Sequence, residues 1–169
     1  MIRQLNGHIT DELVDRILSI IKSQYHKYLK LIGSKEFANV FLEEYAPHKR
    51  QHGISWAISS AFRSNTVIDG ILKVECLRYG KGHTRPSLSN DKIEIHILNK
   101  STDFNANYLM ERYKYNSDNF SREKLFAYIK FEVKNNRLKE VSLCLPDEKG
   151  NVVREEVLLK REDLRLIAA

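Results

Sequence analysis

The sequence has little of the residue types that mark several special classes of protein. Only seven glycines and three prolines occur among its 169 residues. That scarcity excludes collagen-like chains and Pro/Gly-rich disordered chains. No apolar stretch approaches the roughly 18 residues that a membrane-spanning helix needs, and the first residues carry charge too early for a signal peptide. We therefore expect a cytoplasmic protein without a membrane partner.

Cysteine is also scarce, with Cys76 and Cys144 as the only two. Each lies in an apolar strand-like run, and neither has a CxxC or Cys/His spacing around it, which argues against a disulfide scaffold or a zinc site. We expect both to be buried free thiols in a reducing compartment. The chain also lacks the lysine-serine ending of a phosphate-binding P-loop, and we predict no cofactor.

The composition that remains is typical of a folded globular protein. Hydrophobic residues make up 42% of the chain and charged residues 30%. A chain of this length buries about two-thirds of the surface that it exposes when unfolded. No stretch rich in turn residues is long enough to be a linker, and we predict a single domain over residues 1–169.

The first third of the chain has the spacing of helices. Apolar residues recur at steps of three and four over residues 10–33, with Thr10 as an N-cap and Gly33 as the stop. A shorter helix is predicted over 34–46, and a third over about 53–62. The stripe of the first helix consists of Leu13, Ile17, Ile20, Ile21, Tyr25, Tyr28 and Ile32.

Beyond residue 65 the pattern changes to the alternation of strands. Strands are predicted over 71–79, 91–99, 125–133, 137–145 and 151–159, with a short helix over 105–116 and a long loop between the first two strands. Turns at "KNN" and "PDEKG" indicate hairpins between the last three strands. We predict an α+β fold, with an antiparallel sheet of about five strands and the N-terminal helices packed on one face.

This alternation divides the residues of the predicted sheet between a covered face and a wet face. The covered face would hold Leu125, Ala127, Ile129, Phe131, Val133, Val141, Leu143 and Leu145, and the wet face Tyr128, Lys130 and Glu132. On the first two strands, Lys73, Glu75, Glu94 and His96 would share the wet face. Two carboxylates and an imidazole can hold a divalent cation or act as an acid–base pair. Alternating charge is also what any strand with one wet face displays, and we predict no metal site.

The loop "YGKGHTRPSLSN" has residues suited to phosphate. Gly80 and Gly82 permit close backbone approach, Lys81 supplies a point charge, and Arg85 can donate two hydrogen bonds to one phosphate. The alternative is a long turn without chemistry.

A ribonuclease without a metal needs a base, an acid and a cation that stabilises the transition state. His83 and Arg85 of this loop, with His96 or Glu75 of the strands, are the candidate catalytic residues. In the alternative, His83 is an ordinary loop histidine.

A net charge of +6 favours association with polyanions. Besides the loop at 81–85, basic residues gather in "HKRQH", which we place in an exposed loop before the third helix. Trp56 and Tyr79 could stack on bases, although a lone tryptophan at helical spacing is more often part of the core. The candidate nucleic-acid-binding residues are His48, Lys49, Arg50, His52, Arg63, Lys81 and Arg85.

Together these features predict a small basic protein associated with nucleic acid, with RNA favoured over DNA. A metal-independent ribonuclease of toxin or defence type is one form of this hypothesis. The alternative is a non-enzymatic protein-binding or inhibitory partner, such as a toxin–antitoxin component or an anti-defence factor. A stretch rich in tyrosine and arginine over 108–122 supports that alternative. The pattern leaves enzymatic activity and oligomeric state open.

Overall fold

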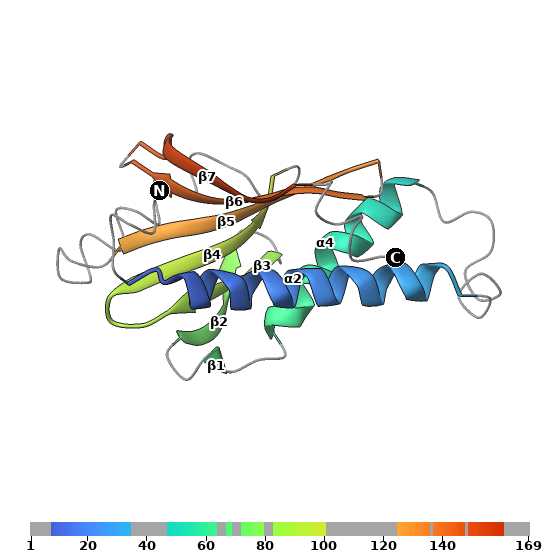
Figure 1. Ribbon diagram of the computed structural model, residues 1–169, viewed down its shortest axis with the longest axis horizontal. Coiled ribbons are helices and arrows are strands. Elements are labelled where there is room, and N and C mark those ends of the chain that lie inside the picture. The colour runs from blue at the N-terminus through green and yellow to red at the C-terminus, as the bar shows by residue number, and fades with distance from the viewer. Residues whose placement is uncertain are drawn as a thin grey trace.

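In the computed structural model of the protein, a seven-stranded sheet carries helices on one of its faces (Figure 1). The structure describes residues 8–34, 47–63, 67–68, 72–79, 83–100, 125–135, 137–147 and 149–160. For residues 47–52, 63, 67–68, 72–79 and 83–85 it describes the backbone alone. The predicted α+β class is confirmed. Within the described ranges, no helix has both the length and the apolar character needed to cross a membrane.

Helix α2 (Asp11–Ile32) has the predicted ends. The hydroxyl of Thr10 accepts a hydrogen bond from the backbone N–H of Leu13 at 3.2 Å. At the other end, the backbone N–H of Gly33 donates to the carbonyl of Leu29 at 3.1 Å. The buried side of the helix consists of Leu13, Val14, Ile17, Leu18, Ile21, Tyr25 and Tyr28. Capping and apolar periodicity thus define this helix locally.

Helix α4 (Pro47–Arg63) begins earlier than predicted. "HKRQH" forms its first turns, and the prediction that this segment is an exposed loop is wrong. The prediction relied on apolar periodicity, which starts only at Ile54, whereas a proline at the first helical position is itself a start signal. The helix predicted over 34–46 lies outside the described residues.

The strands follow one another across the sheet in chain order. They are β1 (Val67–Ile68), β2 (Leu72–Tyr79), β3 (His83–Ser89), β4 (Ile93–Asn99), β5 (Leu125–Lys134), β6 (Arg137–Pro146) and β7 (Val152–Lys160). All neighbouring pairs are antiparallel except β4 and β5, which are parallel. The prediction of an antiparallel sheet of about five strands is therefore met in part, because one pair is parallel and the sheet has seven strands. Parallel neighbours need a connection of a dozen or more residues, and residues 100–124 separate these two strands.

The predicted long loop is largely a strand. Residues 83–89 form β3, which pairs with β2 on one side and β4 on the other. Gly80, Gly82 and Pro86 together suggested a loop, but Pro86 lies within the strand, opposite Cys76. The two-residue strand β1 was also not predicted.

Both predicted hairpins after β5 are confirmed. Between β5 and β6 the chain turns through Asn135, whose φ of 52° is in the left-handed region. Between β6 and β7, Gly150 has a φ of 79°. The Asp147 carboxylate accepts hydrogen bonds there from the backbone N–H groups of Lys149 at 2.9 Å and Asn151 at 2.8 Å. Local turn chemistry sets the position of these two strands.

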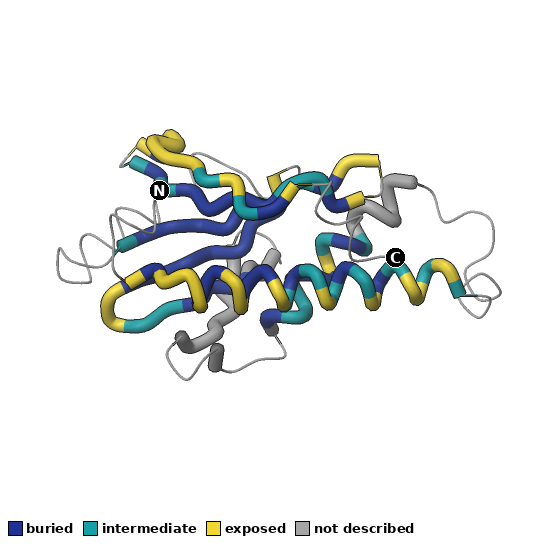
Figure 2. The backbone as a smooth tube through the Cα atoms, viewed as in Figure 1, coloured by how far each residue is buried: buried dark blue, intermediate teal, exposed yellow. Residues whose placement is uncertain are grey.

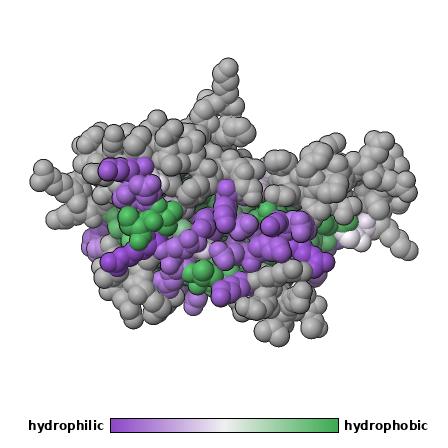
Figure 3. Space-filling model, turned by 90° about the horizontal axis from the view of Figure 1, so that it is seen from above, coloured by the Kyte–Doolittle hydropathy of each residue, from purple (hydrophilic) through white to green (hydrophobic). Residues whose placement is uncertain are grey.

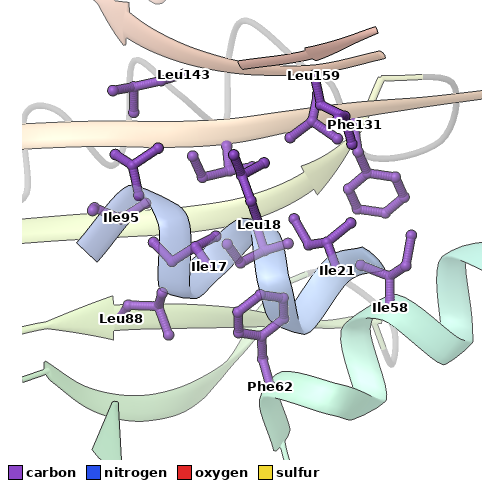
Figure 4. Close-up of a cluster of buried hydrophobic side chains, with 14 of the residues drawn as sticks. Ile17, Leu18, Ile21, Ile58, Phe62, Leu88, Ile95, Phe131, Leu143 and Leu159 are labelled. Carbon is purple, nitrogen blue, oxygen red and sulfur yellow. The ribbon is translucent and has the colours of Figure 1, made fainter. Parts of the chain in front are cut away.

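The main core lies between the helices and one face of the sheet (Figure 4). Ile17 and Ile21 of α2 and Phe62 of α4 pack there against side chains of the sheet. Six of the eight residues predicted for the covered face are buried, and Leu125 and Leu145 are partly buried. The six are Ala127, Ile129, Phe131, Val133, Val141 and Leu143.

The central part of the opposite face of the sheet is buried as well, contrary to prediction, whereas Glu132 is partly exposed as a residue of a wet face would be. All seven residues of β4 are buried, and Tyr128 and Lys130 of β5 are 0% and 8% exposed. The neighbouring central strands are buried along most of their length (Figure 2). Strands that pair in parallel are usually covered on both faces, whereas the prediction assumed an antiparallel sheet with one wet face.

Two aromatic residues of α4 provide a test of this packing. Replacing the fully buried Phe62 with alanine should lower the free energy of unfolding by about 3–5 kcal/mol, because a large cavity forms. The same change at Trp56, which is 67% exposed, should alter it by no more than about 0.5 kcal/mol. Urea unfolding followed by circular dichroism measures both, and equal effects would contradict the described orientation of α4.

Candidate functional site

A row of polar residues crosses the sheet on the face opposite the helices. The strand register places one residue from each of six strands in this row. From β2 to β7 the row contains Glu75, Ser87, His96, Tyr128, Cys144 and Glu155. Its four central members are buried. Buried polar groups of this kind need partners, and the pairs that they form determine what the row can do.

His96 and Glu94 form the first pair. They are two residues apart on β4, and His96 Nε2 shares a hydrogen bond with the Glu94 carboxylate. The ring of Phe126 stands edge-on to the imidazole, with 5.1 Å between the ring centroids. His96 is 0% exposed and Glu94 is 4% exposed. Because its side chain is buried, His96 is not in a position to contact a phosphate group from solution.

Tyr128 and Cys144 lie next to each other in the row. Burial, followed by the nearby Cys144 thiol, raises the pKa of the Tyr128 hydroxyl. Burial also raises the pKa of Cys144 from 9.0 to about 12, although the positive charge of Lys130 opposes the shift. Cys144 is free and buried as predicted, whereas the side chain of Cys76 lies outside the described residues. Neither the phenol nor the thiol ionises near neutral pH, and neither is therefore an activated nucleophile.

The row ends at Glu155 of β7, which is bonded to Lys130 of β5. Lys130 Nζ donates a hydrogen bond to Glu155 Oε1. Burial alone would raise the pKa of Glu155, but the hydrogen bond from Lys130 and the positive charge of Lys130 lower it below its usual value. The carboxylate is consequently ionised at neutral pH and neutralises a largely buried ammonium group.

The described part of the chain therefore contains charge pairs on this face and no metal cluster. No group of three or more His, Cys, Asp or Glu side chains is arranged there to hold a metal ion. On this face His96 bonds to Glu94, and Lys130 bonds to Glu155. Breaking either pair would leave a buried group without its partner.

The other predicted catalytic residues are placed by their backbone only. Glu75 and His96 share the row, with Ser87 between them. His83 and Arg85 lie on the same strand as Ser87, opposite Tyr79 and Leu77. The side chains of Glu75, His83 and Arg85 and the whole of Lys81 lie outside the described residues. Assignment of a base, an acid and a cation to these positions stays a prediction.

A second candidate region is the outward side of α4. Ile54, Ala57, Ile58 and Phe62 of this helix are buried, whereas Trp56 is 67% exposed. The interpretation of Trp56 as a core residue is therefore wrong. Its position on the helix, about 180° from the buried stripe, is the signal that could have shown this.

Basic residues recur on the same side of α4 as Trp56. Lys49 and His52 precede Trp56 by seven and four residues, and Arg63 follows it by seven. Residues at these steps share one side of an α-helix. The outward stripe of α4, defined by Lys49, His52, Trp56 and Arg63, therefore has an exposed indole between basic positions.

A buried hydrogen bond attaches α4 to the sheet. Asn99, at the end of β4, is fully buried, and its Nδ2 donates to the hydroxyl of Ser55. Ser55 directly precedes Trp56, and this bond therefore helps to hold the outward stripe in place. Neither residue was predicted from the sequence, because a contact across 44 positions leaves no local pattern.

A hollow of about 260 Å³ lies where α2 passes the C-terminal part of α4. Its lining is polar and basic, and no acidic side chain belongs to it. The lining residues are Arg16, Ser19, Ile20, Ser23, Gln24, Lys27 and Ala61. Two cations with nearby hydroxyl and amide groups can bind phosphate oxygens.

Comparison with protein-family models, curated protein sequences and solved structures found no match for this chain. The chemistry of the described residues is therefore the basis for a functional proposal.

The buried thiol of Cys144 leads to a prediction for alkaline pH. A pKa that is higher in the folded state means that the folded protein retains a proton that the unfolded chain releases above its ordinary pKa. This contribution to stability is complete below about pH 9 and is lost as the pH rises toward 12. Relative to Cys144→Ser, the wild type should lose up to about 1.4 kcal/mol more of its free energy of unfolding per pH unit in this window.

Urea unfolding at a series of pH values measures this difference. Identical slopes would show that the thiol of Cys144 is not shielded from ionisation.

Proposed function

We propose that the protein binds single-stranded nucleic acid, with RNA favoured over DNA, through the outward stripe of α4. The observation that carries this proposal is the exposed indole of Trp56 on a helix whose basic positions share its side. Stacking of a base on an aromatic side chain contributes about 1–3 kcal/mol. Bases of a single strand are free to stack in this way, and unpaired RNA bases are a common target of such platforms.

Charge supports the same proposal. The chain has a net charge of +6, and the cationic members of the stripe would contact phosphates on either side of a stacked base. Arg16 and Lys27 of the hollow along α2 add further basic groups to the described surface. These two residues are separated by three turns of helix, about 16 Å, and can therefore contact phosphates of different nucleotides.

The proposal is limited to binding. The one predicted catalytic side chain that the structure describes, His96, is buried and bonded to Glu94. A role for His83 and Arg85 in cleavage stays a prediction, as does a toxin or defence role. The protein-binding alternative relied on the stretch over 108–122, which lies outside the described residues.

Tryptophan fluorescence tests the proposal directly, because Trp56 is the only tryptophan in the chain. Titration with a single-stranded RNA of mixed sequence at low salt should quench the emission. Trp56→Ala should weaken binding about 5- to 150-fold, since stacking is lost, while Trp56→Phe retains most of the affinity. Fluorescence anisotropy of labelled RNA measures the variants that lack the indole.

Two controls accompany this titration. Leu31 is an apolar residue of α2 that is 54% exposed, and Leu31→Ala should leave the affinity unchanged. Lys49→Ala and Arg63→Ala should each reduce the slope of log affinity against log salt concentration by about one, because each removes one phosphate contact. Trp56→Ala should leave this slope unchanged. Absence of quenching and of any anisotropy change at low salt would refute the proposal.

A further inference from the structure

Strand β7 is the last strand of the sheet, and no described strand pairs with its outer edge. Strand β7 lies at the top of Figure 1, and Figure 3 shows the molecule from that side. The described surface there is mainly hydrophilic, with separate hydrophobic areas. Val153 and Val157 of β7 are 58% and 43% exposed. A nine-residue edge with exposed valines is a template for pairing with another strand.

The sequence of β7, "VVREEVLLK", is complementary to itself in one antiparallel register. When Glu155 lies opposite Glu155 of a second copy, Arg154 lies opposite Glu156 of that copy. A two-fold axis repeats this contact, which gives two ion pairs across the junction. The regular segment of β7 runs from residue 154 to residue 157, because register shifts lie beside Val153 and beyond Val157.

Other registers lack this complementarity. In an antiparallel pair, two opposite residues direct their N–H and C=O groups either both toward the partner strand or both away from it. Consecutive residues of one strand differ in this direction. In a symmetric pair, the two-fold axis therefore passes between two copies of the same residue. An axis at Arg154 would set arginine opposite arginine, and an axis at Glu156 would set glutamate opposite glutamate. Axes nearer the C-terminal end leave less of the regular segment paired.

The apparent conflict at the axis is offset within each copy. Glu155 accepts a hydrogen bond from Lys130 of its own chain, so the two facing carboxylates are each neutralised by an ammonium group. On the same face, Val157 lies two residues from Glu155 and can cover this charge pair. From the edge position, the exposed valines and the alternation of charge, we propose that two copies of the chain associate through antiparallel β7 strands with the two-fold axis at Glu155.

Charge reversal tests this proposal without any nucleic acid. Nuclease-treated wild type should have twice the 19.8 kDa mass of one chain in light scattering after gel filtration. Arg154→Glu alone and Glu156→Arg alone should each weaken the dimer at least about tenfold, because each sets like charges opposite one another. The double variant, Arg154→Glu with Glu156→Arg, should restore the dimer. Arg137→Glu, an equal charge change at an exposed position of β6, is the matched control.

Disulfide trapping tests the register in a chain whose native cysteines are replaced by serine. Arg154→Cys combined with Glu156→Cys should give a covalent dimer on mild oxidation, since directly opposite residues fall within the Cα separation of a disulfide. Either substitution alone should not. A monomeric wild type at about 100 µM, a dimer unaffected by both single reversals, or a folded double variant that stays monomeric would overturn the proposal, whatever the outcome for RNA binding.

Discussion

Burial of both faces of β4 is the constraint on which the rest of the structure depends. Ile93, Ile95 and Ile97 complete the core beneath the helices, and the alternate residues Glu94 and His96 are thereby directed to the opposite face. Because that face is also buried, the carboxylate needs a partner within the protein, and His96 provides it. The same requirement recurs on the neighbouring strand β5, where Lys130 bonds to Glu155 of β7. Charge pairing thus makes it possible for an alternating strand to occupy the centre of the sheet.

Features with a local physical cause could be predicted from the sequence. Helix α2 has its cap residues and apolar stripe within one segment, and both late hairpins have the glycine or asparagine that a left-handed backbone requires. Features that depend on distant segments could not be predicted in this way. Parallel pairing of β4 with β5 joins residues separated by the connection at 100–124, and this error led directly to the wrong expectation of a wet face. The length of that connection was the available signal, since an antiparallel hairpin does not need it.

In the candidate site, too, local features could be predicted from the sequence, whereas burial, which depends on distant segments, could not. Alternation correctly placed Glu94 and His96 on one face, but burial turns an apparent acid–base pair into a structural contact. Conversely, statistics for a lone tryptophan favoured burial, and the observed helix directs Trp56 outward. Polar residues of the sheet therefore form contacts within the fold, whereas the residues that we propose for nucleic-acid binding lie on α4 and along the hollow beside α2. Stability and binding should respond to different sets of substitutions.

A double-mutant cycle on Glu94 and His96 tests most directly whether the second face of the sheet is buried and whether this pair is a structural contact. Unfolding in urea would be measured for the wild type, Glu94→Gln, His96→Gln and the double variant. If the pair is a buried structural contact, each single change lowers the free energy of unfolding by about 3–5 kcal/mol. The double variant then loses at least about 1 kcal/mol less than the sum of the two single losses. Single effects within about 0.5 kcal/mol of the wild type, adding without coupling, are typical of exposed residues and would contradict the buried second face.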